Sequence, residues 1–113
     1  MTYNSASSGR DGEAHAAQVL REAGYRIIAR NVRLAGGEID LICRDGETIV
    51  FVEVKRRVSR RFGSAVAGVD ARKRATLRRL AADYLQIVAP DARARFDVVA
   101  LDGRRVTVHR NAF

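Results

Sequence analysis

The sequence predicts a single α/β domain with the element order αβββαββ, in which helices flank a mixed β-sheet. Three observations lead to this fold class. The 113 residues leave room for one hydrophobic core. Two segments repeat apolar residues at helical spacing, and the segments between them alternate or are rich in β-branched residues and are divided by glycine-containing turns. We expect residues 1–8 to form a disordered tail and residues 9–113 to form the domain.

Two helices are predicted from apolar spacing. The first covers residues 9–24 and ends at Gly24, and its repeating apolar positions are Ala14, Ala17, Leu20 and Ala23. The second runs from about residue 70 to residue 88, with Asp70 as a plausible N-cap and Pro90 beyond its end. A basic connection over residues 57–68 precedes the second helix.

Five strands account for most of the remaining residues. They cover residues 25–31, 38–43, 48–54, 95–101 and 104–109. Gly36-Gly37, Asp45-Gly46 and Asp102-Gly103 are the predicted turns between neighbouring strands. The third strand contains four consecutive apolar residues, 49–52, so we expect it to be central and covered on both faces.

The charge distribution favours a polyanionic partner. The net charge is +8, and residues 55–79 hold ten cations against one acid, Asp70. A solvated basic face would give the same composition, and anionic lipid is another polyanion. No segment combines this charge with an exposed apolar helix face, so nucleic acid is the preferred partner and no membrane contact is expected. The candidate phosphate contacts are Arg56, Arg57, Arg60, Arg61, Arg72 and Lys73.

Several classes of protein are disfavoured. No segment approaches the roughly 20 apolar residues of a membrane span. The polar amino terminus lacks the apolar core of a signal peptide, and one cysteine, Cys43, cannot form an internal disulfide, so a cytoplasmic location is expected. The absence of His or Cys pairs disfavours a zinc site, and no phosphate-binding NTPase loop is present.

Acidic residues on two neighbouring strands are predicted to converge. Simple alternation places Asp40 on one face with Glu38 and Ile42, and Glu53 on one face with Lys55. If the hairpin pairs these strands in the expected register, Asp40 lies near Glu53, with Lys55 about 7 Å further along the strand. Two such carboxylates would repel each other unless a hard cation such as Mg²⁺ or Mn²⁺ neutralised them.

Two further residues extend this candidate site. Glu13 falls on the core-facing stripe of the first helix, where a carboxylate is costly unless it is paired or binds a metal ion. Lys55 is one of only two lysines among 21 cationic residues, which favours a chemical role for its amine. The amine could stabilise the transition state at phosphorus or help to deprotonate water. Glu38 and Asp97 are weaker candidates for supporting roles.

Taken together, the motifs resemble those of the PD-(D/E)xK nuclease superfamily, and more closely those of the YraN-like family of small bacterial proteins. The matching segments are Gly-Glu at 12–13, Arg-Asn-Val-Arg at 30–33, Gly-Glu-Ile-Asp-Leu-Ile at 37–42, Phe-Val-Glu-Val-Lys at 51–55, Arg-Phe-Asp-Val-Val at 95–99 and Asn-Ala-Phe at 111–113. The resemblance implies a restriction-endonuclease-like fold, with Asp40 as the lone acid and Glu53 and Lys55 as the Glu-x-Lys pair. Archaeal Holliday-junction resolvases similarly place a glutamate in the first helix, here Glu13.

This chain departs from those patterns at two positions. Ile39 stands where the superfamily has proline, and Arg56 stands where the YraN-like family usually has threonine. Three functions remain open at this point. The chain could be a metal-dependent endonuclease acting on DNA, including branched or repair intermediates. It could be a non-catalytic nucleic-acid-binding module within a larger assembly, or a basic structural protein. A homodimer would suit a branched substrate.

Overall fold

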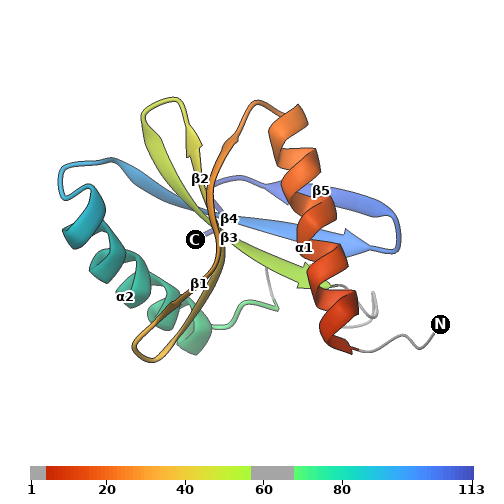
Figure 1. Cartoon of the computed structure of the whole chain (residues 1–113). Helices are drawn as coiled ribbons and strands as arrows, with labels where there is room; N and C mark the ends of the chain where they lie inside the picture. Colours follow the sequence, from red (N-terminus) through yellow and green to blue (C-terminus); the bar gives the residue numbers. More distant parts are fainter. Residues whose placement is uncertain (1–4, 57–67) are drawn as a thin grey trace.

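The computed structural model describes the backbone of residues 5–56 and 68–113 (Figure 1). Its elements are α1 (Ser5–Glu22), β1 (Arg26–Leu34), β2 (Gly37–Asp45), β3 (Thr48–Arg56), α2 (Ala71–Val88), β4 (Ala94–Asp102) and β5 (Arg105–His109). The predicted order αβββαββ is therefore confirmed.

The two helices differ in how well the sequence predicted their starts. α1 begins at Ser5, so residues 5–8, which were expected to belong to the tail, are helical. This run of serine and alanine carries neither apolar spacing nor a strong stop signal, so periodicity does not mark where the helix begins. Asp70 is the N-cap of α2 as predicted, and its side chain accepts a hydrogen bond from the backbone N–H of Lys73 (2.8 Å). Neither described helix is long and apolar enough to cross a membrane.

The strands form one mixed sheet in the order β1-β2-β3-β4-β5. The β3–β4 pair, which is connected through α2, is parallel, and the other neighbouring pairs are antiparallel. β3 therefore lies in the middle of the sheet. Parallel neighbours require a long crossover connection, and the segment containing α2 provides it.

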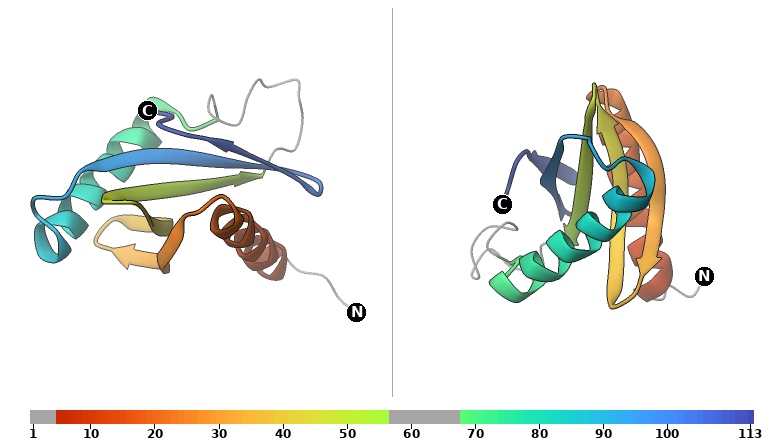
Figure 2. Two further views of the ribbon diagram at one scale, coloured as in Figure 1. Left: turned by 90° about the horizontal axis from the view of Figure 1, so that it is seen from above. Right: turned by 90° about the vertical axis from the view of Figure 1, so that its left-hand side faces the viewer.

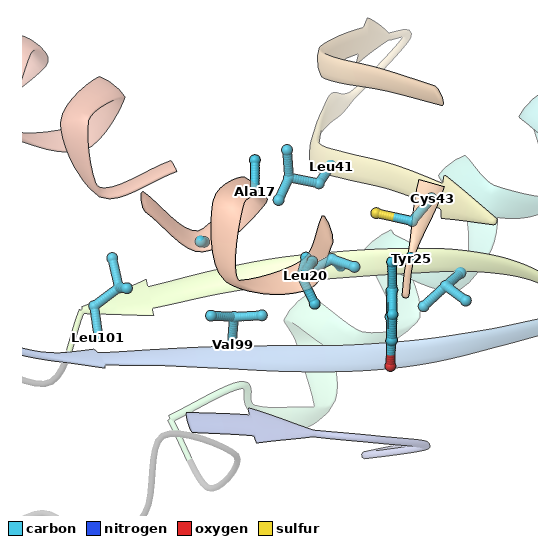
Figure 3. Close-up of a cluster of buried hydrophobic side chains, with 10 residues drawn as sticks. Ala17, Leu20, Tyr25, Leu41, Cys43, Val99 and Leu101 are labelled. Carbon is cyan, nitrogen blue, oxygen red and sulfur yellow. The ribbon is translucent and has the colours of Figure 1, made fainter. Parts of the chain in front are cut away.

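The two helices cover opposite faces of this sheet (Figures 1 and 2). Alternate residues of β3 point to the two sides, so Val50 and Val52 join the core beneath α1 while Ile49 and Phe51 join the core beneath α2. Leu20 of α1 is fully buried in the first core, which Figure 3 shows in close-up. The prediction that the third strand is covered on both faces is confirmed.

Asp97 is fully buried and has structural partners. Its carboxylate accepts hydrogen bonds from the Tyr25 hydroxyl (2.7 Å), from the Arg95 guanidinium (3.1 and 3.2 Å) and from the backbone N–H of Asn111 (2.9 Å). The Tyr25 hydroxyl reaches towards β4 in Figure 3. The suggested role in orienting the acidic site is therefore wrong, because this carboxylate instead ties the start of β1 and the C-terminal segment to β4.

We expect Asp97→Ala to lower the free energy of unfolding by about 3 kcal/mol, because it leaves the partly buried Arg95 without its main acceptor. Urea denaturation of the variant and the wild type measures this change. Asp91→Ala, at an exposed position, is the matched control and should stay within about 0.5 kcal/mol of wild type. A loss below about 1 kcal/mol for Asp97→Ala would contradict the structural role.

Candidate functional site

The candidate site lies where β2 and β3 separate. Their ladder runs from Asp45 opposite Thr48 to Leu41 opposite Val52, and it ends there although both strands continue. Beyond this point β2 stays paired with β1, and β3 stays paired with β4 as far as Arg56. The sheet therefore opens between its second and third strands, and the next residues along each strand, Asp40 and Glu53, lie at the opening.

The side chain of Asp40 replaces backbone pairing at this opening. Its Oδ2 atom accepts a hydrogen bond from the backbone N–H of Val54 at 2.8 Å. A buried N–H without a partner would cost about 1–3 kcal/mol, so this contact makes the separation of the strands tolerable. It also fixes one oxygen of Asp40 beside β3.

Strict alternation does not hold along the first half of β2. Ile39 and Ile42 both pack in the core beneath α2, although alternation predicts that they point to opposite faces. The prediction that Glu38, Asp40 and Ile42 share one face is therefore wrong in its simple form. The irregularity falls at the end of the β2–β3 ladder, where the strand is no longer held flat between two neighbours.

Glu13 reaches the opening from α1. Together with Asp40 and Glu53 it lines a cavity of about 210 Å³. Gly12 lets the helix approach the sheet closely, because a Cβ at this position would lie 2.7 Å from the Cδ1 atom of Leu101. Asn31, in the left-handed region of backbone conformation (φ 52°), hydrogen-bonds to the Glu13 carboxylate and helps to position it.

Glu38 joins this group more closely than the sequence indicated. One carboxylate oxygen each from Glu13, Glu38 and Asp40 all lie within 4.8 Å of one another. Glu53 is outside this tight group, although it lines the same cavity as Glu13 and Asp40. Alternation pointed to Glu38 as a neighbour of Asp40, but it was given only a supporting role because residues at strand starts are usually solvated.

Glu53 is the most perturbed carboxylate in this cavity. Burial, followed by the negative charge of Asp40, raises its pKa to about 7, while Lys73 and Lys55 act in the opposite direction. Its Oε2 atom is buried and has no hydrogen-bond partner among the described residues. A buried carboxylate oxygen without a donor is costly, and a proton or a cation would relieve that cost.

The neighbouring acids are perturbed in the same direction. Burial and then the charge of Asp40 raise the pKa of Glu13, and the hydrogen bond from Asn31 opposes this shift. Burial also raises the pKa of Asp40, against the lowering effects of the Val54 N–H and of Lys73. The cavity therefore concentrates more negative charge than its own surroundings neutralise.

The predicted cations surround the site unevenly. Lys55 is exposed, two residues beyond Glu53, and Arg56 lines the cavity. Lys73, predicted as a phosphate contact, acts electrostatically on both Asp40 and Glu53 from the first turn of α2. Arg72 is exposed on the same turn, while Arg57, Arg60 and Arg61 lie outside the described residues.

Comparison with known proteins identifies the family. The model of the uncharacterised protein family UPF0102 matches residues 12–101. The chain belongs to the UPF0102 family. That range includes all four acids of the site.

Similarity to individual UPF0102 proteins extends over most of each chain. The protein from Dechloromonas aromatica (strain RCB) is 46% identical over 93% of this chain and 87% of its own length. The protein from Moorella thermoacetica is 50% identical over 89% of this chain and 85% of its own length. The protein from Symbiobacterium thermophilum is 50% identical over 93% of this chain and 94% of its own length.

The donors in this UPF0102 site suit a hard divalent cation. They are all carboxylate oxygens, which Mg²⁺ and Mn²⁺ prefer over softer ligands. In the octahedral shell of one Mg²⁺ ion, neighbouring ligands lie about 3 Å apart and opposite ligands about 4.2 Å apart, so the three oxygens of Glu13, Glu38 and Asp40 would draw closer together to share one ion. The Glu53 oxygen that has no hydrogen-bond partner among the described residues offers a further ligand at the same cavity.

The raised pKa of Glu53 predicts a pH-dependent stability in the absence of divalent ions. Since its folded pKa of about 7 exceeds the ordinary 4.5, the folded protein binds this proton more tightly than the unfolded chain does. The stabilisation is complete below pH 4.5 and is lost as the pH rises through about 7. As the pH rises between these limits, the free energy of unfolding of the wild type should fall further than that of Glu53→Gln. The difference between the two falls should be at most about 3 kcal/mol.

Urea denaturation in the presence of a chelator, at several pH values from 4.5 to 8, measures this difference. Glu47→Gln, at an exposed position in the β2–β3 turn, should keep the wild-type dependence. If the free energy of unfolding depends on pH equally in the wild type and in Glu53→Gln, the pKa of Glu53 is not raised in the folded protein.

Proposed function

We propose that this UPF0102 protein is a divalent-metal-dependent phosphodiesterase that hydrolyses nucleic acid, with DNA as the favoured substrate. The observation that carries the proposal is the cavity between β2 and β3, which Glu13, Asp40 and Glu53 line and where one buried Glu53 oxygen has no hydrogen-bond partner among the described residues. Hydrogen bonds from neighbouring donors do not explain this concentration of carboxylates, whereas Mg²⁺ or Mn²⁺ would.

Each acid has a distinct part in holding the ion. Asp40 has one oxygen fixed by the Val54 N–H, so its other oxygen is directed with little loss of freedom. Glu13 comes from the other side of the cavity, on α1, and Glu38 adds a further oxygen close to both. When bound, the cation supplies positive charge that polarises a phosphodiester and favours formation of hydroxide from water.

Lys55 supplies the positive charge expected beside the reacting phosphate. Its exposed amine follows Glu53 by two residues on β3 and acts electrostatically on that carboxylate. In hydrolysis, the oxygen of water forms a bond to phosphorus, and the bond from phosphorus to the leaving sugar oxygen breaks. The proton that water loses is balanced by protonation of that sugar oxygen. An ammonium group at this position stabilises the negative charge that develops on the phosphoryl oxygens.

The surrounding charge supports nucleic acid as the substrate class. The chain carries a net charge of +8, and Arg56, Arg72 and Lys73 lie beside the acidic cavity or on the first turn of α2. The N-terminus of a helix adds partial positive charge from its backbone N–H groups. The resemblance to junction-resolving nucleases makes branched DNA and repair intermediates the first forms to test.

Cleavage of labelled single strands, duplexes, four-way junctions and RNA, with Mg²⁺, Mn²⁺ or chelator, tests the proposal. We expect metal-dependent cleavage of at least one DNA form, and a loss of about 10²-fold or more in Asp40→Asn and in Lys55→Ala. Asparagine can still accept the Val54 N–H, so the first variant removes charge while leaving the opening intact.

Glu47→Gln and Arg93→Ala change exposed charges near the other end of β3 from Glu53 and should cleave like the wild type. Salt-sensitive binding without cleavage under any metal condition would overturn the enzyme proposal. That outcome would instead favour a non-catalytic nucleic-acid-binding module.

A further inference from the structure

A second cavity lies between the C-terminal end of α2 and the edge strand β1. Its volume is about 400 Å³, within the roughly 300–1,000 Å³ of typical ligand pockets. We call it the edge groove. Its apolar lining comes from Ile27, Ile28, Ile49, Tyr84 and Val88. It shares no lining residue with the acidic cavity.

Two exposed apolar side chains line this groove. Among the described residues, the exposed large hydrophobic side chains are Ile28 (42%), Ile87 (82%) and Val88 (56%), and of these Ile28 and Val88 line the groove. Ile28 lies at the irregularity in the β1–β2 register between Ile27 and Ala29. Such a bulge redirects side chains, and the isoleucine at this one is exposed.

Two arginines flank the same groove in an unfavourable arrangement. Arg26 and Arg44 are directly opposite each other on the antiparallel strands β1 and β2, and both line the groove. Like charges opposite each other on neighbouring strands destabilise a sheet. Among the described residues that line the groove none is acidic, so the groove itself supplies no carboxylate to neutralise the pair.

We propose that the edge groove binds an acidic segment of a partner protein, with a large apolar side chain inserted into the groove and flanking carboxylates paired with Arg26 and Arg44. The aliphatic lining fits a protein side chain better than a phosphate backbone. A symmetric second copy would bring the four arginines of two grooves together, whereas an acidic partner neutralises the pair.

The position of the groove gives this binding a consequence. Ile49 and Arg44 lie four residues from Glu53 and Asp40 on the same strands, which corresponds to about 13 Å. A partner held here would be adjacent to the acidic cavity without blocking it. A partner that binds nucleic acid would thereby raise the local concentration of substrate at that cavity.

Fluorescence anisotropy with the full chain tests the proposal. The probes are labelled peptides carrying Leu-Leu, Leu-Phe or Phe-Phe between runs of Asp and Glu, at physiological salt. We expect saturable binding of at least one probe, and at least tenfold weaker binding to Val88→Asp and to Arg44→Glu. A peptide with Gly-Ser in place of the apolar pair should bind at least tenfold more weakly to the wild type.

Two variants provide matched controls. Ile87→Asp adds the same charge to an exposed apolar position next to Val88 that does not line the groove, and Arg104→Glu reverses an equally exposed charge elsewhere. Both should bind within twofold of the wild type. Equal binding by the Gly-Ser peptide, or unchanged binding by the two groove variants, would overturn the proposal.

Two further outcomes would also overturn it. One is a wild-type dimer in sedimentation that Val88→Asp dissociates, which would make the groove an interface between copies. The other is binding of single-stranded DNA, with no peptide binding, that Val88→Asp and Arg44→Glu both abolish.

Thermal unfolding tests separately whether the repulsion between Arg26 and Arg44 destabilises the sheet. Arg44→Thr should raise the midpoint by a few degrees, because it removes the like-charge pair. A lowered midpoint would show that Arg44 stabilises the folded protein and that the Arg26–Arg44 pair needs no acidic partner.

Discussion

The hydrogen bond from the Val54 N–H to the Asp40 carboxylate takes the place of the next backbone contact between β2 and β3. Without it, the opening of the sheet would leave a partly buried backbone donor unsatisfied in the middle strand of the sheet. With it, the two strands separate while their outer neighbours hold them, and a cavity forms that both helices can reach. Glu13 enters from α1, and Lys73 acts from the first turn of α2. The arrangement of Asp40 and Glu53 at the opening therefore depends on this one contact.

The same arrangement conflicts with stability in the absence of a bound cation. Burial and mutual repulsion raise the pKa values of Glu13, Asp40 and Glu53 together, so the folded chain would be more stable with these groups neutral or absent. The buried carboxylate of Asp97 behaves differently, because four donors satisfy it. Two inward-facing acids on neighbouring strands are thus distinguished by their partners: Asp97 stabilises the fold, and Glu53 lacks a partner that the described residues could supply.

The sequence contained most of the fold because its signals are local. The four apolar residues 49–52 identify a central strand, and Asp70 marks the start of α2. Asp45-Gly46 fixes the hairpin whose last pair is Leu41 and Val52, so that Asp40 and Glu53 are the next residues along the two strands. The remainder depends on tertiary contacts. Alternation could not show that the β2–β3 ladder ends at Leu41, so it missed the irregularity at Ile39. The place of Glu38 at the start of a strand gave no sign that it lies against Glu13. Likewise, the structural role of Asp97 follows from its contact with Tyr25, and the effect of Lys73 follows from its charge acting on Asp40. The sequence shows neither neighbour.

The central claim is that the opening between β2 and β3 is a divalent-cation site. A crystal grown with Mn²⁺ tests it most directly, through the anomalous difference map of the metal. The account predicts a peak between the carboxylates of Glu13, Glu38 and Asp40, in the cavity that Glu53 also lines, and the loss of that peak in Asp40→Asn crystals with an unchanged fold. A cavity without a peak at saturating Mn²⁺, or a peak only at surface acids such as Asp91, would contradict it.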